Sequence, residues 1–217
     1  MAKNNYKGSK NSKFMWEDGD GRKLTAGGLV PYNDKGIWLV AERGKKMEHV
    51  VWTDVGGRYM FEDCDIYKTI AREAGEELYH SSELLRQHVI QISKNNKPIY
   101  VNGHRGLPVY IAYPVTTEEL EKYGFVLDPR QFHKNRIQAL KSNPYVPREY
   151  YVTIQLKFFT WNDIFGEFSK KPRLSYRIKR ILKDPLFQVY AERCKPRILS
   201  KNDPVEEIIP QFEKLWS

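Results

Sequence analysis

The clearest amphipathic pattern in the chain lies between residues 66 and 78. Apolar residues recur there at helical spacing and predict a helix with one buried face. They are Ile66, Ile70, Ala74 and Leu78. The run just upstream, residues 52–55, is β-prone and ends in a glycine pair, Gly56 and Gly57, which permits positive φ and close backbone approach. The predicted order is therefore a strand, a glycine loop and a helix.

Further runs of β-prone residues predict more strands. They lie at residues 24–30, 37–43, 107–115 and 151–159. The first two flank an Asn-Asp-Lys-Gly loop at 33–36, which predicts a hairpin. The last runs into residues 160–164, interpreted as a tryptophan-containing strand end. Apolar residues at helical spacing predict a helix at 175–182, and residues 205–216 are typical of a short amphipathic helix that packs back on the domain.

Composition predicts one main domain with an extension at each end. At 217 residues and 41% hydrophobic, the chain is long enough to bury a sizeable core. We expect a flexible basic tail at 1–22, the domain at 23–166 and a basic helical extension at 167–217. No secretory or membrane-spanning pattern is found, and two cysteines, Cys64 and Cys194, predict a reducing, cytoplasmic setting. Cys64 is interpreted as a packing residue.

The net charge of +9 is concentrated near the C-terminal end. Residues 170–201 hold eleven basic residues against two acidic ones. Because the apolar positions of 175–182 face inward, we expect the basic ones to form an outward stripe that suits nucleic-acid phosphates. A solubilising surface helix is the alternative. The residues assigned to nucleic-acid binding are Lys170, Lys171, Arg173, Arg177, Lys179 and Arg180.

Three carboxylates share one face of the predicted helix. Glu73, Glu76 and Glu77 stand at i, i+3 and i+4, where like charges repel by about 0.2–0.5 kcal/mol per pair. Arg72 offsets part of this repulsion, and a hard divalent cation such as Mg²⁺ or Mn²⁺ would offset it better. The position of Glu73 and Glu77 at the border of the apolar stripe favours a cleft over a solvated acidic face, which remains the alternative. The chemistry indicated is hydrolysis of phosphate esters or phosphoanhydrides.

These residues resemble the signature of the Nudix hydrolase family. That signature is Gly, five residues, Glu, seven residues, then Arg-Glu-apolar-x-Glu-Glu-x-Gly-apolar. Residues 72–77 match its metal-binding half position by position, and Gly57 matches the leading glycine. Arg58 falls where the family commonly carries a basic residue.

The chain departs from the signature at two points. The loop is one residue longer, so the lone Glu falls on Asp63 when counted forward from Gly57 and on Cys64 when counted back from Arg72. Candidates for its role are therefore Glu62, Asp63 and Asp65. In addition, Tyr79 and His80 replace the glycine and the apolar residue at the end of the signature. The helix must end differently or continue.

The resemblance implies an α+β or α/β fold, an α/β/α sandwich around a mixed sheet, and Mg²⁺- or Mn²⁺-dependent hydrolysis of a nucleoside diphosphate linked to another group. Glu73, Glu76 and Glu77 would hold the metal, and Arg72 would orient them. Gly56, Gly57, Arg58 and Asp63 would form the phosphate-side loop. The general base is expected to be either a glutamate of the signature or an acid from a distant loop, and the loop candidates are Glu149 and Glu118. The residues assigned to catalysis are Glu76, Glu77, Arg72 and Glu149.

The expected substrate contains a nucleotide, and the best candidate is the 5′ cap of messenger RNA, as for Nudix decapping enzymes of large DNA viruses. Basic residues within 123–148 could form a lid. Aromatic residues that could stack on a base are Tyr59, Phe61, Tyr110 and Tyr113. Two alternatives stay open: hydrolysis of small nucleotides, dinucleoside polyphosphates or diphosphoinositol polyphosphates, and a non-catalytic module that binds RNA or protein. We expect no membrane partner, and the oligomeric state is open.

Overall fold

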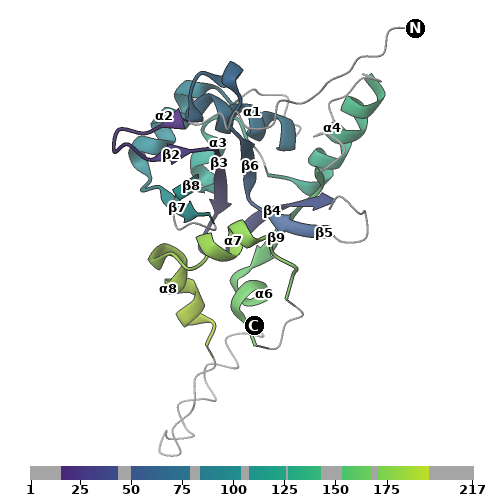
Figure 1. Ribbon diagram of the computed structural model, residues 1–217. Helices are drawn as coiled ribbons and strands as arrows, with labels where there is room; N and C mark the ends of the chain where they lie inside the picture. The colour runs from purple at the N-terminus through teal and green to yellow at the C-terminus, as the bar shows by residue number, and fades with distance from the viewer. Residues whose placement is uncertain are drawn as a thin grey trace, which may run out of the picture.

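The computed structural model describes residues 16–43, 50–78, 84–103, 108–125, 127–142, 153–167 and 171–195 (Figure 1). The strands are β1 (Trp16–Glu17), β2 (Lys23–Leu24), β3 (Ala26–Tyr32), β4 (Gly36–Arg43), β5 (Val50–Thr53), β6 (Val55–Arg58), β7 (Ile99–Asn102), β8 (Pro108–Thr116) and β9 (Thr153–Thr160). The helices are the 3₁₀ turn η1 (Phe61–Asp63) and α1 (Ile66–Leu78), α2 (Arg86–Asn95), α3 (Thr117–Glu121), α4 (Pro129–Ser142), α6 (Trp161–Phe165), α7 (Tyr176–Ile181) and α8 (Pro185–Arg193).

The main sheet is mixed, with strand order β5-β4-β3-β8-β7, and with β6 paired to β3 and β9 paired to β4. β3 runs parallel to β8, while the pairs that β3 forms with β4 and β6 are antiparallel. β4 also pairs antiparallel with β5 and β9. The described chain is therefore a mixed α/β structure with strands of both directions in one sheet, as predicted.

The sheet separates two apolar cores, because successive side chains of a strand point to opposite faces. On β3, Leu29 joins the core under α1 and α2, whereas Val30 joins the core under α6, α7 and α8. β8 alternates in the same way, with Ile111 in the first core and Ala112 in the second. Figure 1 shows α1 on one side of the sheet and α7 on the other.

Several predicted elements are confirmed. The amphipathic run forms α1, with all four of its apolar stripe residues buried. The hairpin β3–β4 closes where Tyr32 pairs with Ile37, and the side chain of Asn33 accepts hydrogen bonds from the amides of Lys35 and Gly36. β8 and β9 lie where strands were predicted, with bounds shifted by one or two residues.

The predicted glycine loop is wrong. Gly56 and Gly57 lie inside β6, where they pair with Gly28 and Gly27 of β3. Neither has a positive φ, and the described glycines that do are Gly21 and Gly124. These strand glycines therefore serve close approach rather than a turn. Residues 160–164 also differ from prediction, because Thr160 caps α6 through the amide of Asp163 and ends the strand.

The predicted tail ends too late, because residues 16–22 already belong to the folded part. β1 pairs antiparallel with β2, and the Trp16 ring meets that of Tyr67 edge-on at 5.8 Å. The guanidinium of Arg22 lies 4.5 Å from the centre of the Tyr100 ring. Residues 1–15 and the predicted helix at 205–216 lie outside the described residues.

The helices beyond residue 167 contribute to the second core. Ile178, Ile181 and Phe187 are fully buried there, and the amide of Trp52 donates to the carbonyl of Arg173 at 2.9 Å. The proposed division at residue 166 stays a prediction. Among the described residues, no helix combines the length and apolarity needed to cross a membrane.

Candidate active site

The site begins where α1 packs across β6. A side chain at Gly57 would place its Cβ 2.2 Å from the carboxyl carbon of Glu73, and one at Gly27 would lie 3.0 Å from Ile70. Real Cβ atoms do not approach other atoms as closely as the first of these distances. The two paired glycines therefore allow the acidic helix to lie directly against the backbone of the sheet.

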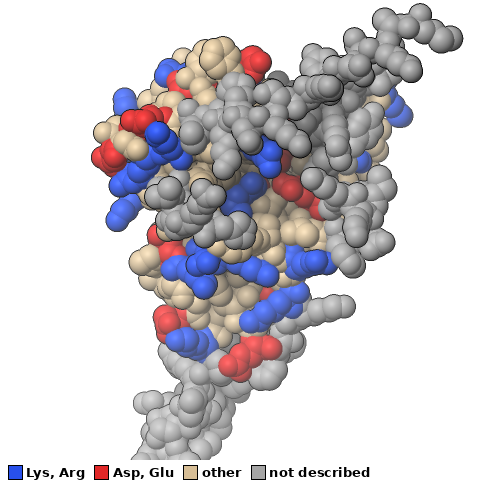
Figure 2. All heavy atoms as spheres, viewed as in Figure 1, with Lys and Arg blue, Asp and Glu red and all other residues tan. Residues whose placement is uncertain are grey.

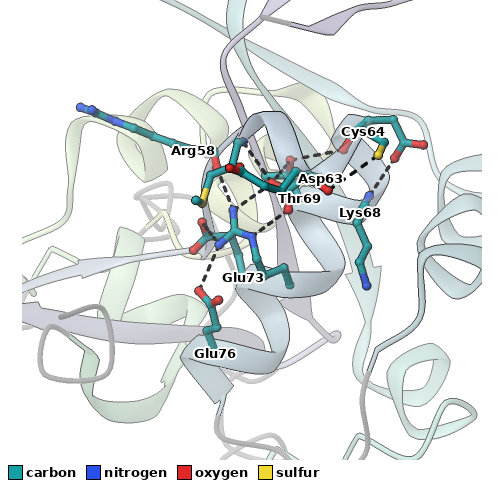
Figure 3. A network of polar contacts seen from close by, with 11 residues as sticks. Arg58, Asp63, Cys64, Lys68, Thr69, Glu73 and Glu76 are labelled. Atoms are coloured by element: carbon teal, nitrogen blue, oxygen red, sulfur yellow. Dashed lines mark hydrogen bonds and ion pairs between the residues drawn. The ribbon is translucent and has the colours of Figure 1, made fainter. Parts of the chain in front are cut away.

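Arg72 is the centre of a hydrogen-bond network at the start of this contact (Figure 3). Its Nε and Nη2 donate to the two oxygens of Asp63 at 2.9 and 3.0 Å, a bidentate ion pair. Its Nη1 donates to Glu73 at 2.9 Å and to Glu76 at 3.1 Å. Nη2 also donates to the carbonyl oxygen of Arg58 at 3.0 Å, so one guanidinium joins the helix, the loop and strand β6.

Of the three loop acids that the sequence left as candidates, Asp63 is the one that bonds Arg72. It also accepts hydrogen bonds from Thr69 Oγ1 at 2.8 Å and from the Met60 amide at 3.0 Å. Burial alone would raise the pKa of Asp63, but the hydrogen bonds from Arg72, Thr69 and Met60 outweigh it and hold the pKa below its usual value. Asp65 instead pairs with Arg86, and Glu62 is exposed.

The extra loop residue is accommodated at Cys64, whose φ of 66° is the one positive value found for a non-glycine residue in the described ranges. Its amide donates to the carbonyl of Phe61 and closes η1. The side chain is exposed, so the interpretation of Cys64 as a packing residue is wrong. The left-handed turn lets Asp63 face Arg72 despite the longer loop.

Glu73 and Glu77 are each 8% exposed, which is unusual for carboxylates. Burial raises the pKa of Glu73 to about 7, despite the opposing charge of Arg72 and with a further contribution from Glu76. Glu77 accepts a hydrogen bond from the Gly56 amide at 2.7 Å. Its pKa is raised well above the usual value, first by burial and then by the charge of Glu42. The site therefore gathers more acidic side chains than cations around Arg72.

The donor set fits a hard divalent cation in type and in charge. Carboxylate oxygens are the ligands that Mg²⁺ and Mn²⁺ prefer. An added cation would favour the charged forms of Glu73 and Glu77, whose pKa values are raised first by burial and then by neighbouring acids. Within the described ranges, no group of three or more His, Cys, Asp or Glu side chains is arranged to hold a metal ion as it stands. Glu73 and Glu76 face Arg72 instead, so binding would require their carboxylates to turn.

A second arginine reaches β6 from the opposite layer. Arg177 of α7 donates through Nε to Asp54 at 2.6 Å and through Nη2 to the carbonyl of Gly56 at 3.0 Å. Tyr110 donates its hydroxyl to the other oxygen of Asp54 at 2.5 Å, and its ring centre lies 4.6 Å from the guanidinium of Arg177. The carbonyl of Gly56 therefore faces Arg177, while its amide faces Glu77.

Arg177 was predicted to belong to an outward basic stripe, and its contacts with Asp54 show that this prediction is wrong. Asp54 is completely buried, and burial alone would lower the pKa of Arg177, but the charge of Asp54 and the Tyr110 hydroxyl raise it. The sequence contained a sign that Arg177 points inward, because it stands four residues before the buried Ile181, at the border of the apolar face. The network was nevertheless not foreseen, since Arg177 and Asp54 are 123 residues apart.

The other described members of the stripe are exposed. They are Lys171, Arg173, Lys179 and Arg180. Figure 2 shows Lys and Arg side chains in a band across the region where α7 lies in Figure 1. Their assignment to nucleic-acid binding stays a prediction, and Lys170 lies outside the described residues.

The remaining predicted residues are dispersed. Tyr110 and Tyr113 are each 4% exposed, so they are core residues and cannot offer a face to a base, whereas Phe61 is 70% exposed and Tyr59 is half-buried. Glu118 is exposed in the first turn of α3, and Glu149 lies outside the described residues. The side chain of Arg58 extends away from Glu73 and Glu76 in Figure 3.

The basic insertion forms helix α4 in its described part. Phe132 packs in the first core with Leu156 of β9, and Arg136 donates to the carbonyl of Thr153 at 3.2 Å. Leu78, at the end of α1, and Phe132 line one small cavity. α4 therefore borders the far end of the acidic helix, and its role as a lid stays a prediction.

Comparisons with known proteins give a loose likeness to solved structures. No family model matches the chain, and no curated protein matches it. A solved structure described as "NUDIX hydrolase from Nitrosomonas europaea" is similar over 43% of this chain and 57% of that chain, with 19% identity and a TM-score of 0.28. So loose an overlap does not establish the family. The residues of the signature and the contacts around Arg72 are the stronger observations.

Proposed function

We propose that the protein is a metal-dependent hydrolase of the Nudix type, which cleaves a phosphoanhydride bond in a nucleotide-containing substrate. The observation that carries the proposal is the buried carboxylate surplus on α1, where Glu73 and Glu77 both have raised pKa values beside an arginine-bound Glu76. A surplus of this kind is costly unless a cation balances it. Arg72, by contrast, has the role of an orienting group.

Each candidate ligand is held by a hydrogen bond from this chain. Arg72 bonds Glu73 and Glu76, Asp63 fixes Arg72 from behind, and the Gly56 amide bonds Glu77. A bound Mg²⁺ or Mn²⁺ supplies neutralisation of the phosphate charge and acidification of a water molecule. The protein's own contribution is to hold the carboxylates in fixed positions, because small displacements of catalytic groups reduce reaction rates strongly. Glu149 is proposed as the general base.

For the substrate we propose the 5′ cap of messenger RNA, with release of a methylated guanosine diphosphate. The net charge of +9 and the exposed basic residues around α7 support a large polyanion over a small metabolite. Small nucleotides, dinucleoside polyphosphates and diphosphoinositol polyphosphates are the competing substrates. A non-catalytic binding module is the competing function.

The test is hydrolysis with Mg²⁺ or Mn²⁺ of capped RNA, free cap dinucleotide and a panel of these small substrates. We expect Glu76→Gln and Glu77→Gln to lower kcat by at least about 100-fold, because each keeps the side-chain shape and removes one charge from the metal site. Glu121→Gln is the matched control, since Glu121 is an exposed acid of α3. Retained turnover in both variants would refute the metal assignment, and no turnover of any substrate by the unmodified protein would favour the binding module.

A further inference from the structure

The outer face of α7 forms one wall of a cleft. Tyr176, Arg180 and Lys183 stand at i, i+4 and i+7, so they share a face of the helical turn, which continues through Leu182 in helical conformation. Across from them lie Val101, Asn102 and Gly103 at the end of β7, and the cleft between measures about 530 Å³. The inner face of the same helix carries Ile178 and Ile181 into the second core.

The cleft combines an accessible aromatic ring with positive charge. Tyr176 is 53% exposed, which is high for a large ring. Arg180 donates through Nε to the Tyr176 hydroxyl at 3.0 Å, and its guanidinium carbon lies 5.0 Å from the ring centre. Arg180 and Lys183 are both exposed, and the described residues that line the cleft include no acid. An anion that enters the cleft therefore meets two cations without a competing carboxylate.

The strand side of the cleft offers backbone groups. β7 is the last strand in the sheet order, so within the described residues one edge of it is paired with β8 and the other is not. The unpaired edge presents amides and carbonyls that can bond a ligand. The register with β8 shifts between Val101 and Asn102, and an irregularity of this kind at an edge disfavours pairing with another strand. A compact polar ligand suits this edge better than an extended peptide.

We propose that the cleft between α7 and the end of β7 binds one nucleotide of a single-stranded nucleic acid. The base stacks on the ring of Tyr176, the phosphate lies against Arg180 and Lys183, and the end of β7 bonds the edge of the base. Aromatic stacking together with a cationic groove is the usual mode of binding single strands. The volume lies within the range of about 300–1,000 Å³ typical of small-ligand sites.

This binding is separate from the proposed hydrolysis. The cleft lies on the α7 side of the sheet, whereas Glu73, Glu76 and Glu77 belong to α1 on the other side. Binding should therefore persist in EDTA and in Glu77→Gln, so failure of the hydrolysis proposal and failure of the cleft proposal give different results.

The test is fluorescence anisotropy of the full-length protein in EDTA, with a labelled oligouridylate of roughly 12 nucleotides, within the usual site size for a single strand. Tyr176→Ala should weaken binding about tenfold, the effect expected for loss of one stacked base, while Tyr176→Phe keeps the ring and should bind like the unmodified protein. Arg180→Ala and Lys183→Ala should each lower the slope of log K against log salt by about 0.7.

Two further lysine variants separate the cleft from general surface charge. Lys94→Ala removes an exposed charge from α2 and should leave affinity unchanged, and Lys179→Ala, which lies outside the cleft, should weaken binding less than Arg180→Ala. Circular dichroism checks the fold of each variant. Equal binding by Tyr176→Ala and Tyr176→Phe would overturn the stacking. Equal losses of affinity in Lys179→Ala and Arg180→Ala would overturn the assignment of nucleotide binding to the cleft. The absence of binding by the unmodified protein would overturn it as well.

Discussion

Two arginines hold strand β6 from opposite layers of the protein, and the contrast between them explains how the candidate site is built. Arg72 of α1 donates to the carbonyl of Arg58, and Arg177 of α7 donates to the carbonyl of Gly56, both at 3.0 Å. Each also pairs with an aspartate, Asp63 for Arg72 and Asp54 for Arg177. The two networks have similar parts in different surroundings.

The difference lies in the balance of charge. Arg72 is shared by Asp63, Glu73 and Glu76, so its network has more carboxylates than cations and can take up another cation. Asp54 has two donors of its own in Arg177 and Tyr110, with a third hydrogen bond from Thr53. The charge of Asp54 is thus balanced within the Arg177 network, whereas the Arg72 network has more carboxylates than cations, as the proposed metal site requires.

The largest loss of stability should follow when Arg177 is removed from its contact with Asp54. Arg177→Met leaves Asp54 buried without its cation and should lower the free energy of unfolding by about 3–5 kcal/mol. Arg177→Lys, which keeps a charge, should lose less. Urea denaturation measures both. If Arg177→Met proves too unstable to purify, the Lys variant still tests the prediction, because no loss of stability there would contradict it.

Arg72→Met sharpens the comparison. Asp63 keeps its bonds from Thr69 and Met60, and Arg72 itself is 21% exposed, so the cost to folding should be smaller, about 1–3 kcal/mol. The rate of hydrolysis should fall by much more than the small loss of folding stability would explain. The comparison fails if Arg72→Met destabilises the protein more than Arg177→Met does.

The metal-free protein should lose stability as pH rises from about 5 to about 8. The raised pKa of Glu73, about 7, favours its protonated form in the fold, so that contribution is complete below the unfolded value of 4.5 and is lost as pH passes through about 7. The upper limit is roughly 3 kcal/mol. The lowered pKa of Asp63 acts oppositely, with stability lost as pH falls through its range.

Denaturation in EDTA across this pH range measures the effect, and Glu73→Gln should reduce the decline. Added Mn²⁺ should restore stability at the alkaline end if the carboxylates take up the cation. A decline of the same size in Glu73→Gln would show that another group is responsible.

Gly57→Ala should disturb the Arg72 network alone. The new methyl group would collide with the Glu73 carboxylate, a side chain that can move, so the cost in stability should be about 1–3 kcal/mol and the loss of activity greater. In Gly56→Ala the Cβ would lie 2.4 Å from the Gly27 carbonyl oxygen and from the Tyr110 hydroxyl oxygen. This substitution should therefore destabilise the protein more than Gly57→Ala does. Thermal unfolding and hydrolysis rates distinguish the two variants.

The smallest effect should come from Gly75→Ala on α1. Its Cβ would meet nothing within 4 Å, and alanine is the better helix former, so the protein should gain up to about 1 kcal/mol with unchanged activity. The same substitution at Gly57 and Gly75 thus has opposite results. A lower thermal midpoint in Gly75→Ala would contradict the expectation that a methyl group fits there without contact.

The sequence by itself determined the parts of the site that are local. The spacing of apolar residues predicted α1, and Glu73, Glu76 and Glu77 were grouped because residues three and four apart on a helix meet without help from the rest of the fold. The orienting role of Arg72 came from the resemblance to the signature. Asp63, nine residues before Arg72, stayed one candidate of three, since the backbone turn at Cys64 decides which acid faces the arginine.

Tertiary structure decided the contacts between distant segments. Gly56 and Gly57 looked like a turn, but pairing with β3 places them in a strand under α1. Arg177 was predicted to be a surface residue because nothing near it in the sequence indicates its partner Asp54. Tyr110 and Tyr113 were predicted to stack on a base, but helices cover both faces of the sheet and bury their rings. Helical spacing is set by local geometry, whereas the partner of a buried charge is set by the layers that the whole chain brings together.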